Sequence, residues 1–413
     1  MQLTFVTGTT GTEKRAVLEC VKGYAEEHGL ASPGDIEIFH VEDELKALGK
    51  DLQTFADTSV PSKQREWWSA AVERIHARIE DRRPQPKFVF ISFHYYWYYR
   101  KRIFTPVDWS PLRRLANQAS HFIFVTLIDD CYAMWARITN RPTNPREIRL
   151  AECITWRSFE VSAADLCARE LAPELDERRE RPLTAEPRSY VVSVNHPPAT
   201  LARLAFRTEA KRLYLCYPIS IVRRAASQNE AQFPASAIDA FRHRVQDDYP
   251  YVVFDPLGID EEILALKLAD LDAADTAQDR LVIEPSDRWP IPEQRRLLGE
   301  SAIAQAGRTL VRYPLELPVD QVREAAELAH YDIPSRDLRW VDDAHCLVAY
   351  RPFWGNRPHT GTQTEINRAT FSGARVIAYS PPEDRAASPF ATGVPIIPDE
   401  QEFYNAVGAF GAG

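Results

Sequence analysis

Short apolar runs alternate with amphipathic stretches along the first half of the chain. Five of these runs have the length of buried strands, and they lie at residues 3–7, 36–41, 87–93, 122–129 and 190–195. Polar and apolar positions recur with helical spacing between them, chiefly at residues 13–27, 62–80 and 147–171. Strands that alternate with helices in this way predict parallel strands joined by crossover helices, which is the α/β class.

The same alternation starts again near residue 208, after a charged, proline-bearing stretch at residues 172–188. Four further strand-like runs follow, at residues 213–217, 251–256, 346–352 and 375–381. We therefore predict two doubly wound parallel-sheet domains, residues 1–207 and 208–413. Residues 264–330 carry charged helices and several prolines, and we interpret them as an insertion or lid in the second domain.

Composition narrows the class of partner. The chain has 413 residues, and its 45% hydrophobic composition fits a globular protein. Its formal net charge of −9 argues against a general nucleic-acid or anionic-membrane surface. No apolar run approaches the ~18 residues of a membrane helix, and the first apolar run is interpreted as a strand and not as a signal peptide. The six cysteines show no CxxC pairing and mostly sit in apolar runs, so we predict reduced thiols in a cytoplasmic protein.

The first strand runs directly into the glycine loop GTTGTEKR and then into a helix. This order lets backbone N–H groups and a helix N-terminus hold phosphate. Gly8, Gly11 and Lys14 stand where the Walker A loop of P-loop nucleotide kinases has its first two glycines and its lysine, so the segment resembles that family. Glu13 replaces the glycine before the lysine, and Arg15 replaces the hydroxyl residue that holds Mg²⁺, so the loop is a degenerate member.

Two readings of the loop stay open. Either it binds a nucleotide or another anion, with ATP and Mg²⁺ as the cofactors the resemblance implies, or it is a tight turn with Lys14 solvated. Asp129 and Asp130 follow a buried strand, where one of them would help to hold Mg²⁺ as a Walker B acid does. Capping of the next helix is the alternative role for the same two carboxylates.

The second half resembles the nucleoside 2-deoxyribosyltransferase family. The resemblance rests on a strand with a Tyr-x-x-x-Pro phrase (Tyr214 to Pro218), an Asp-Leu at Asp337, the strand CLVAY, and a Gly-Thr-x-x-Glu phrase that begins at Gly361. These phrases occur in family order between residues 211 and 383, with residues 264–330 unmatched. The resemblance implies a flavodoxin-like or Rossmann-like fold and a homo-oligomer.

The resemblance also implies roles for three side chains. Cleavage of an N-glycosidic bond passes through an oxocarbenium-like state, which a carboxylate stabilises or attacks while an acid protonates the leaving base. By the motif, Glu365 is the nucleophile, Asp337 is the acid and Tyr214 holds Glu365 in place. The structural alternatives are a capping box formed by Thr362 and Glu365, a helix cap at Asp337 and a core tyrosine at position 214.

Residues around this phrase are predicted to bind substrate. They are Pro218, Arg351, Arg357, His359, Thr360, Gly361 and Thr362. His359 and Thr360 stand where the deoxyribosyltransferases carry acidic residues. The cations among these residues favour a phosphorylated substrate, because arginine binds phosphate oxygens in pairs; alternatively, they balance an acidic surface.

The sequence therefore predicts N-glycosidic bond cleavage, by hydrolysis or base exchange, of a small-molecule nucleotide or nucleoside. This step requires no metal or other cofactor. Two other classes of function compete with it: a P-loop phosphotransferase or ATPase whose second domain binds nucleotide, and a non-catalytic nucleotide sensor or scaffold.

Overall fold

The computed structural model divides the chain into two compact units. It describes residues 1–58, 60–140, 147–176, 188–220, 223, 235–274, 278–288, 311, 313–354, 357–384 and 393–411. Unit 1 comprises Met1–Phe206 and Ile259–His330, and unit 2 comprises Arg207–Gly258 and Tyr331–Gly413. The division differs from the predicted one, because the segment that we assigned to the second domain as an insertion or lid packs with unit 1.

Unit 1 is built on a five-stranded parallel sheet in the order β2-β3-β1-β6-β7. Its strands are β1 (Gln2–Gly8), β2 (Ile36–His40), β3 (Phe88–Ser92), β6 (His121–Ile128) and β7 (Arg188–Ser193). All five coincide with apolar runs of the sequence. A short antiparallel ribbon of β4 (Trp97–Tyr99) and β5 (Arg102–Phe104) follows β3.

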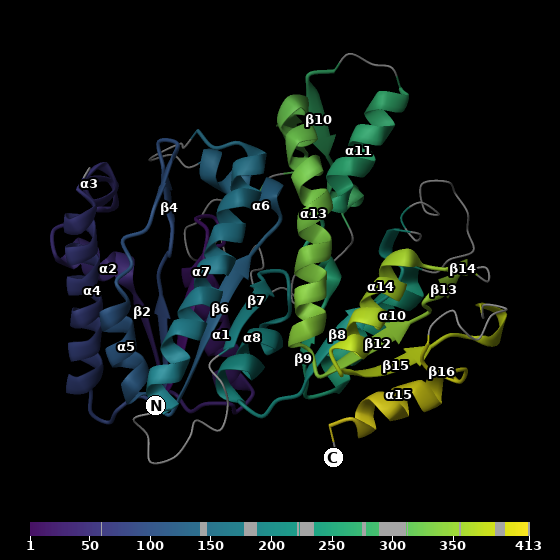
Figure 1. Cartoon of the computed structure of the whole chain (residues 1–413), viewed down its shortest axis with the longest axis horizontal. Coiled ribbons are helices and arrows are strands. Elements are labelled where there is room, and N and C mark those ends of the chain that lie inside the picture. Colours follow the sequence, from purple (N-terminus) through teal and green to yellow (C-terminus); the bar gives the residue numbers. More distant parts are fainter. Residues whose placement is uncertain are drawn as a thin grey trace. The chain divides into compact units, whose positions relative to one another are not determined.

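Helices cover both faces of this sheet (Figure 1). They are α1 (Lys14–Glu27), α2 (Val41–Ala47), α3 (Leu52–Asp57), α4 (Pro61–Asp81), α5 (Trp109–Gln118), α6 (Cys131–Thr139), α7 (Leu150–Asp176) and α8 (Pro198–Phe206). Helices α1 and α8 pack together on one face, where Phe206 contacts the rings of Phe88 and Phe90. Helices α4, α5 and α7 pack on the other face, so the sheet is doubly wound.

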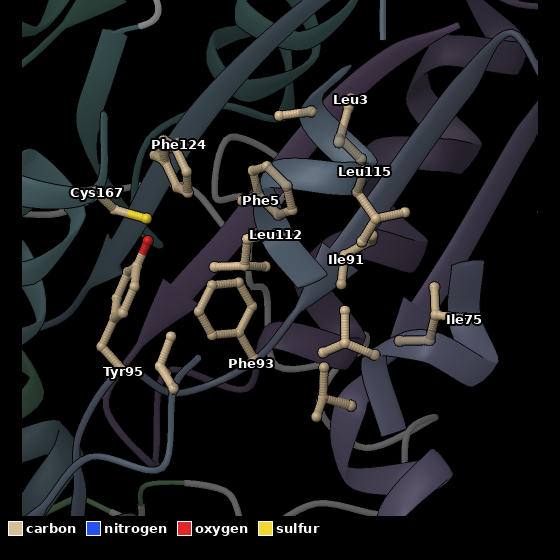
Figure 2. Close-up of a cluster of buried hydrophobic side chains, with 14 of the residues drawn as sticks. Leu3, Phe5, Ile75, Ile91, Phe93, Tyr95, Leu112, Leu115, Phe124 and Cys167 are labelled. Atoms are coloured by element: carbon tan, nitrogen blue, oxygen red, sulfur yellow. The ribbon is translucent and has the colours of Figure 1, made fainter. Parts of the chain in front are cut away.

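The core of unit 1 lies between the sheet and helices α4, α5 and α7. Figure 2 shows Phe5 of β1 and Phe93 meeting Leu112 of α5, with the hydroxyl of Tyr95 beside the sulfur of Cys167. Alternate residues of β1, β3 and β6 contribute to this cluster, as the two-residue period of a strand requires. Phe93, Tyr95 and Trp97, which follow β3, belong to the same core.

The second segment of unit 1 is held by a buried ion pair. Arg157 on α7 donates two hydrogen bonds of 2.8 Å to Glu261, which directly precedes α11 (Glu262–Ala273). Strands β10 (Arg280–Ile283) and β11 (Leu315–Pro318) then pair antiparallel, with the 3-10 turn η2 (Pro285–Asp287) between them. Because Arg157 and Glu261 are far apart in sequence, periodicity along the chain did not reveal that they pair.

Unit 2 contains a second five-stranded parallel sheet, in the order β16-β15-β12-β8-β9. Its strands are β8 (Arg212–Cys216), β9 (Val252–Phe254), β12 (Cys346–Tyr350), β15 (Arg375–Tyr379) and β16 (Ile396–Ile397). Numbered within the unit, the order is 2-1-3-4-5, which is flavodoxin-like. The predicted α/β class with two doubly wound parallel sheets is confirmed.

Helices flank the second sheet on both faces. They are α10 (Ala235–Asp248), the part of α13 (Val319–Asp343) from Tyr331 onward, α14 (Thr360–Phe371) and α15 (Glu400–Ala409). The unit also contains the 3-10 turns η1 (Pro256–Gly258) and η4 (Pro382–Asp384) and the ribbon of β13 (Phe353–Trp354) and β14 (Arg357–Pro358). Phe241 on α10 stacks on Tyr350, beside Phe403 of α15. On the opposite face Arg368 of α14 bonds Asp342 of α13.

None of the six cysteines, all of which are described, forms a disulfide, and five of them are buried. No described helix is both long enough and apolar enough to cross a bilayer.

Candidate functional site

A tyrosine and a glutamate meet on one face of the unit 2 sheet. Tyr214 lies in the middle of β8 with no exposed surface, and its hydroxyl donates a 2.8 Å hydrogen bond to Oε1 of Glu365 on α14. Burial raises the pKa of Tyr214 well above its usual value, so the hydroxyl keeps its proton and acts as a donor. Glu365 itself stays partly exposed. Its carboxyl group is therefore oriented by a buried donor.

Asp337 is the second carboxyl group of this cluster. It is buried on α13, where its Oδ1 accepts hydrogen bonds from Nε of Arg336 at 3.1 Å and from Nη2 at 3.0 Å. Burial raises the pKa of Asp337 to about 6, although the Arg336 guanidinium acts in the opposite direction. Asp337 lies inside a helix that begins at Val319, so it does not cap the helix as the alternative reading expected. Pro334 also lies inside α13.

The charge of Asp337 affects the protonation of Glu365. Burial, and after it the charge of Asp337, raise the pKa of Glu365 to about 8, while the thiol of Cys216 and the hydroxyl of Tyr214 act against the rise. Like charges that share a site cannot both ionise easily. Near neutral pH the pair therefore holds about one proton, which is the condition under which one carboxyl acts as an acid and the other as a base or nucleophile.

Asp255, directly after β9, adds a further charge that sequence reasoning missed. It accepts hydrogen bonds from the Tyr217 hydroxyl, from Nε of Arg242 at 2.8 Å and from Nε2 of Gln246 at 2.9 Å. Its negative charge contributes to the raised pKa of Asp337. An aspartate that directly follows a buried strand was the available signal, because ligands of such sheets bind at the carboxyl ends of the strands.

The predicted substrate-binding residues of the Gly-Thr-x-x-Glu phrase form the start of α14. His359 is the N-cap: its Nδ1 accepts from the Thr362 backbone N–H at 3.3 Å and lies 3.0 Å from the Thr362 hydroxyl. The predicted capping box between Thr362 and Glu365 is therefore wrong, because His359 caps the helix instead. Thr360 and Gly361 form the exposed first turn, and Thr362 is buried.

The other predicted substrate-binding residues lie at the ends of strands. Arg351 follows β12 with a left-handed backbone (φ 52°), and its Nε donates to Asp384 at 2.7 Å. This cation therefore already has a carboxylate partner. Pro218 is buried just beyond β8, and Arg357 begins β14, with its side chain outside the described part of the structure.

The glycine loop of unit 1 keeps the backbone shape of an anion-binding turn. Gly8 and Gly11 have φ values of 136° and 100°, and a Cβ on Gly8 would come within 2.4 Å of the Leu127 carbonyl oxygen. Glu13 adopts the left-handed conformation (φ 52°, ψ 44°) that glycine normally supplies. The backbone geometry is therefore retained even where the glycine has been replaced.

The polar groups of this loop bond to other parts of unit 1. Nζ of Lys14 donates to the Gly8 carbonyl at 2.9 Å and lies 3.1 and 3.2 Å from the two ring nitrogens of His94. Arg15 pairs with Asp43 at 2.5 Å. Mg²⁺ needs oxygen ligands, and the position that supplies one in a Walker A loop carries the guanidinium of Arg15 here. The loop therefore does not fit a Mg²⁺-nucleotide.

The two aspartates after β6 are engaged as well. Asp129 accepts from Arg137 and from Nδ2 of Asn195 at 3.1 Å, and no group of three or more metal-ligating side chains occurs among the described residues. Asp130 occupies the N-cap position of α6 without a side-chain cap. The predicted capping by these aspartates is wrong, because Glu261 accepts the first helical N–H, that of Cys131, at 2.8 Å.

Comparison with known proteins adds little to this geometry. No protein-family model matches the chain, and no curated protein matches it. A solved structure of shikimate kinase from Acinetobacter baumannii in complex with shikimate resembles 51% of this chain and 95% of that chain, with 14% identity and a TM-score of 0.29. A TM-score of this size carries no argument, so the function is inferred from the site itself.

Proposed function

We propose that unit 2 cleaves the N-glycosidic bond of a nucleotide or nucleoside, with water or a second base accepting the sugar. The observation that carries the proposal is the 2.8 Å hydrogen bond from Tyr214 to Glu365, next to the buried carboxyl group of Asp337. The resemblance of the surrounding phrases to nucleoside 2-deoxyribosyltransferases supports the same assignment. Glu365 attacks or stabilises the anomeric carbon, and Asp337 protonates the leaving base.

The proposed reaction uses the singly protonated form of the pair. Departure of the base leaves positive charge on the sugar, which an ionised Glu365 stabilises, and the base needs a proton, which a neutral Asp337 supplies. With a pKa of about 6 for Asp337 and about 8 for Glu365, the pair carries one proton between these limits, and that proton lies mainly on Glu365. The reactive form, with the proton on Asp337, is the minor form of the same singly protonated pair. We expect kcat/KM to be bell-shaped with its maximum near pH 7, because both limbs report the loss of this singly protonated state.

The test is a chromatographic assay for free base, with purified protein and a panel of ribo- and deoxyribonucleosides and their 5′-monophosphates. Glu365→Gln should lower base release at least 100-fold, because an amide cannot serve as nucleophile. Glu402→Gln, an exposed glutamate on α15, is the matched control and should retain wild-type activity. Absence of free base from every substrate, or equal activity of wild type and Glu365→Gln, would overturn the proposal.

A further inference from the structure

We propose that Arg336 is a positioning residue, which holds Oδ1 of Asp337 and so leaves Oδ2 as the atom that gives a proton to the leaving base. The proposal rests on the function proposed above and assigns the proton to one atom of that site. Arg336 directly precedes Asp337 on α13, and both side chains are buried. Both residues belong to the part of α13 that lies in unit 2.

The contacts of the guanidinium select one oxygen of the carboxyl group. Nε of Arg336 lies 3.1 Å from Oδ1 of Asp337, and Nη2 lies 3.0 Å from the same oxygen. Among the described residues, none donates a hydrogen bond to Oδ2. A proton on Oδ1 would point at two N–H donors, so in the neutral form of Asp337 the proton lies on Oδ2.

A tryptophan fixes the guanidinium in this place. Adjacent residues of a helix do not normally face each other, so the pairing of Arg336 with Asp337 needs a further constraint. The ring of Trp340, one turn later on α13, supplies it, because the guanidinium carbon lies 5.2 Å from the ring centroid. Trp340 has no exposed surface and stacks on Phe254 of β9 at an interplanar angle of 7°. The sheet thus holds the ring that holds the guanidinium.

The same contact stabilises Asp337 once its proton has gone. As the bond between the sugar and the base breaks, its electron pair passes to the base nitrogen, which takes the proton from Oδ2. Asp337 is then a buried carboxylate, and Arg336 is the cation paired with it. Burial raises the pKa of Asp337, and the guanidinium acts against that rise. The titratable and charged groups coupled to Asp337 are Arg336 and Asp332 on α13, Asp255 after β9, Tyr214 and Cys216 on β8, and Glu365 on α14.

A second arginine–aspartate pair provides the matched control. Nε and Nη2 of Arg368 on α14 bond Asp342 of α13 at 2.7 and 2.6 Å. Both side chains of this pair are exposed. Arg368→Met therefore removes the same two donors from a carboxylate of the same helix without touching Asp337.

The first readout is kinetic and compares Arg336→Met, Arg336→Lys and Arg368→Met in the full chain. The substrates are the nucleoside or nucleotide that wild type cleaves fastest and the 4-nitrophenyl glycoside of the same sugar, whose phenolate leaves without a proton. Arg336→Met should lower kcat for the first substrate at least 10-fold and change its KM less than threefold, because a misplaced acid is felt in the transition state.

The loss on the nitrophenyl glycoside should stay below threefold in Arg336→Met, which a merely structural role would not produce. Arg336→Lys keeps the charge without the fork and should show an intermediate loss on the first substrate. Arg368→Met should match wild type on both substrates.

The second readout does not need activity: it is the unfolding free energy, measured by urea titration between pH 4 and pH 8. The pKa of Asp337 is raised from 3.8 to about 6 in the folded protein, so its stabilisation is lost as the pH rises through about 6. This loss should move about 1 pH unit upward in Arg336→Met, because the guanidinium no longer favours the carboxylate. The movement should vanish when Asp337→Asn is also present.

The outcomes separate the two proposals. A wild-type protein that releases no base overturns the proposed function, while the stability readout still tests how Arg336 acts on Asp337. Equal losses of kcat on the two substrates, an unmoved stability loss in Arg336→Met, or a movement that persists with Asp337→Asn overturns the positioning role. If Arg336→Met does not fold, a ratio of kcat values between the two substrates that is the same in Arg336→Lys and wild type overturns it.

Discussion

Replacing Glu365 by glutamine should change how the stability of the protein depends on pH. The pKa of Glu365 is raised in the folded protein to about 8, from its usual 4.5, first by burial and then by Asp337. The folded state therefore holds this proton more tightly than the unfolded chain does. The resulting stabilisation is fully present below pH 4.5 and is lost as the pH rises through about 8.

The structure sets the size of the effect. The full difference between the two pKa values corresponds to about 5 kcal/mol, at ~1.36 kcal/mol per pH unit. Because Glu365 keeps part of its surface in solvent, screening reduces this, and we expect about 2 to 3 kcal/mol. Glutamine retains an oxygen that accepts from Tyr214 but does not titrate. Relative to wild type, Glu365→Gln should gain that amount of stability between pH 5 and pH 9.

Urea unfolding followed by circular dichroism at half-unit pH steps measures this difference directly. The unfolding free energy of Glu365→Gln minus that of wild type should rise with pH and level off above pH 9. Glu402→Gln, which lies on the exposed face of α15, should show a change below about 0.5 kcal/mol over the same range. A flat or falling difference for Glu365→Gln would refute the argument that burial and Asp337 hold a proton on this carboxyl group.

Two further predictions follow from the charges of each unit. Asp337→Asn removes the like charge beside Glu365, so the midpoint of the stability loss should move about 1 pH unit toward acid, and an unmoved midpoint would contradict the coupling. Arg157→Ala leaves the buried carboxylate of Glu261 without its ion-pair partner and should cost about 3 to 5 kcal/mol in urea unfolding. Arg149→Ala, which breaks exposed pairs, should cost no more than about 1 kcal/mol, and equal losses would show that burial does not set the cost.

The elements that carry the site were predictable because their signals are local. Runs of apolar residues defined the strands β1, β8 and β12, and a glycine-bounded polar stretch defined the start of α14. Both signals depend on side chains within a few residues of each other, which is the range over which strand and helix periods act. The placement of Tyr214 on a strand and of Glu365 near the start of a helix could therefore be read from the chain, while their pairing was implied only by the resemblance to the deoxyribosyltransferases.

Signals of the same kind misled at α13 and at the ends of α6 and α14. The alternative of a helix cap at Asp337 placed a helix boundary there, yet the helix runs through this position from Val319. A polar residue at the right spacing suggested a cap at Thr362, while His359 performs it. Propensity describes what a residue tolerates, and packing decides which of the tolerated arrangements is formed.

By itself, then, the sequence determined the fold class, the two parallel sheets and the residues that lie at the carboxyl ends of their strands. Only the tertiary structure decided that the segment Ile259–His330 belongs to unit 1, that Lys14 bonds its own loop, and that the buried thiol of Cys216 bonds the Thr362 carbonyl. Each of these depends on a pairing between residues far apart along the chain. Such pairings are selected by burial and charge neutralisation after the chain has folded back on itself, and no local pattern encodes them.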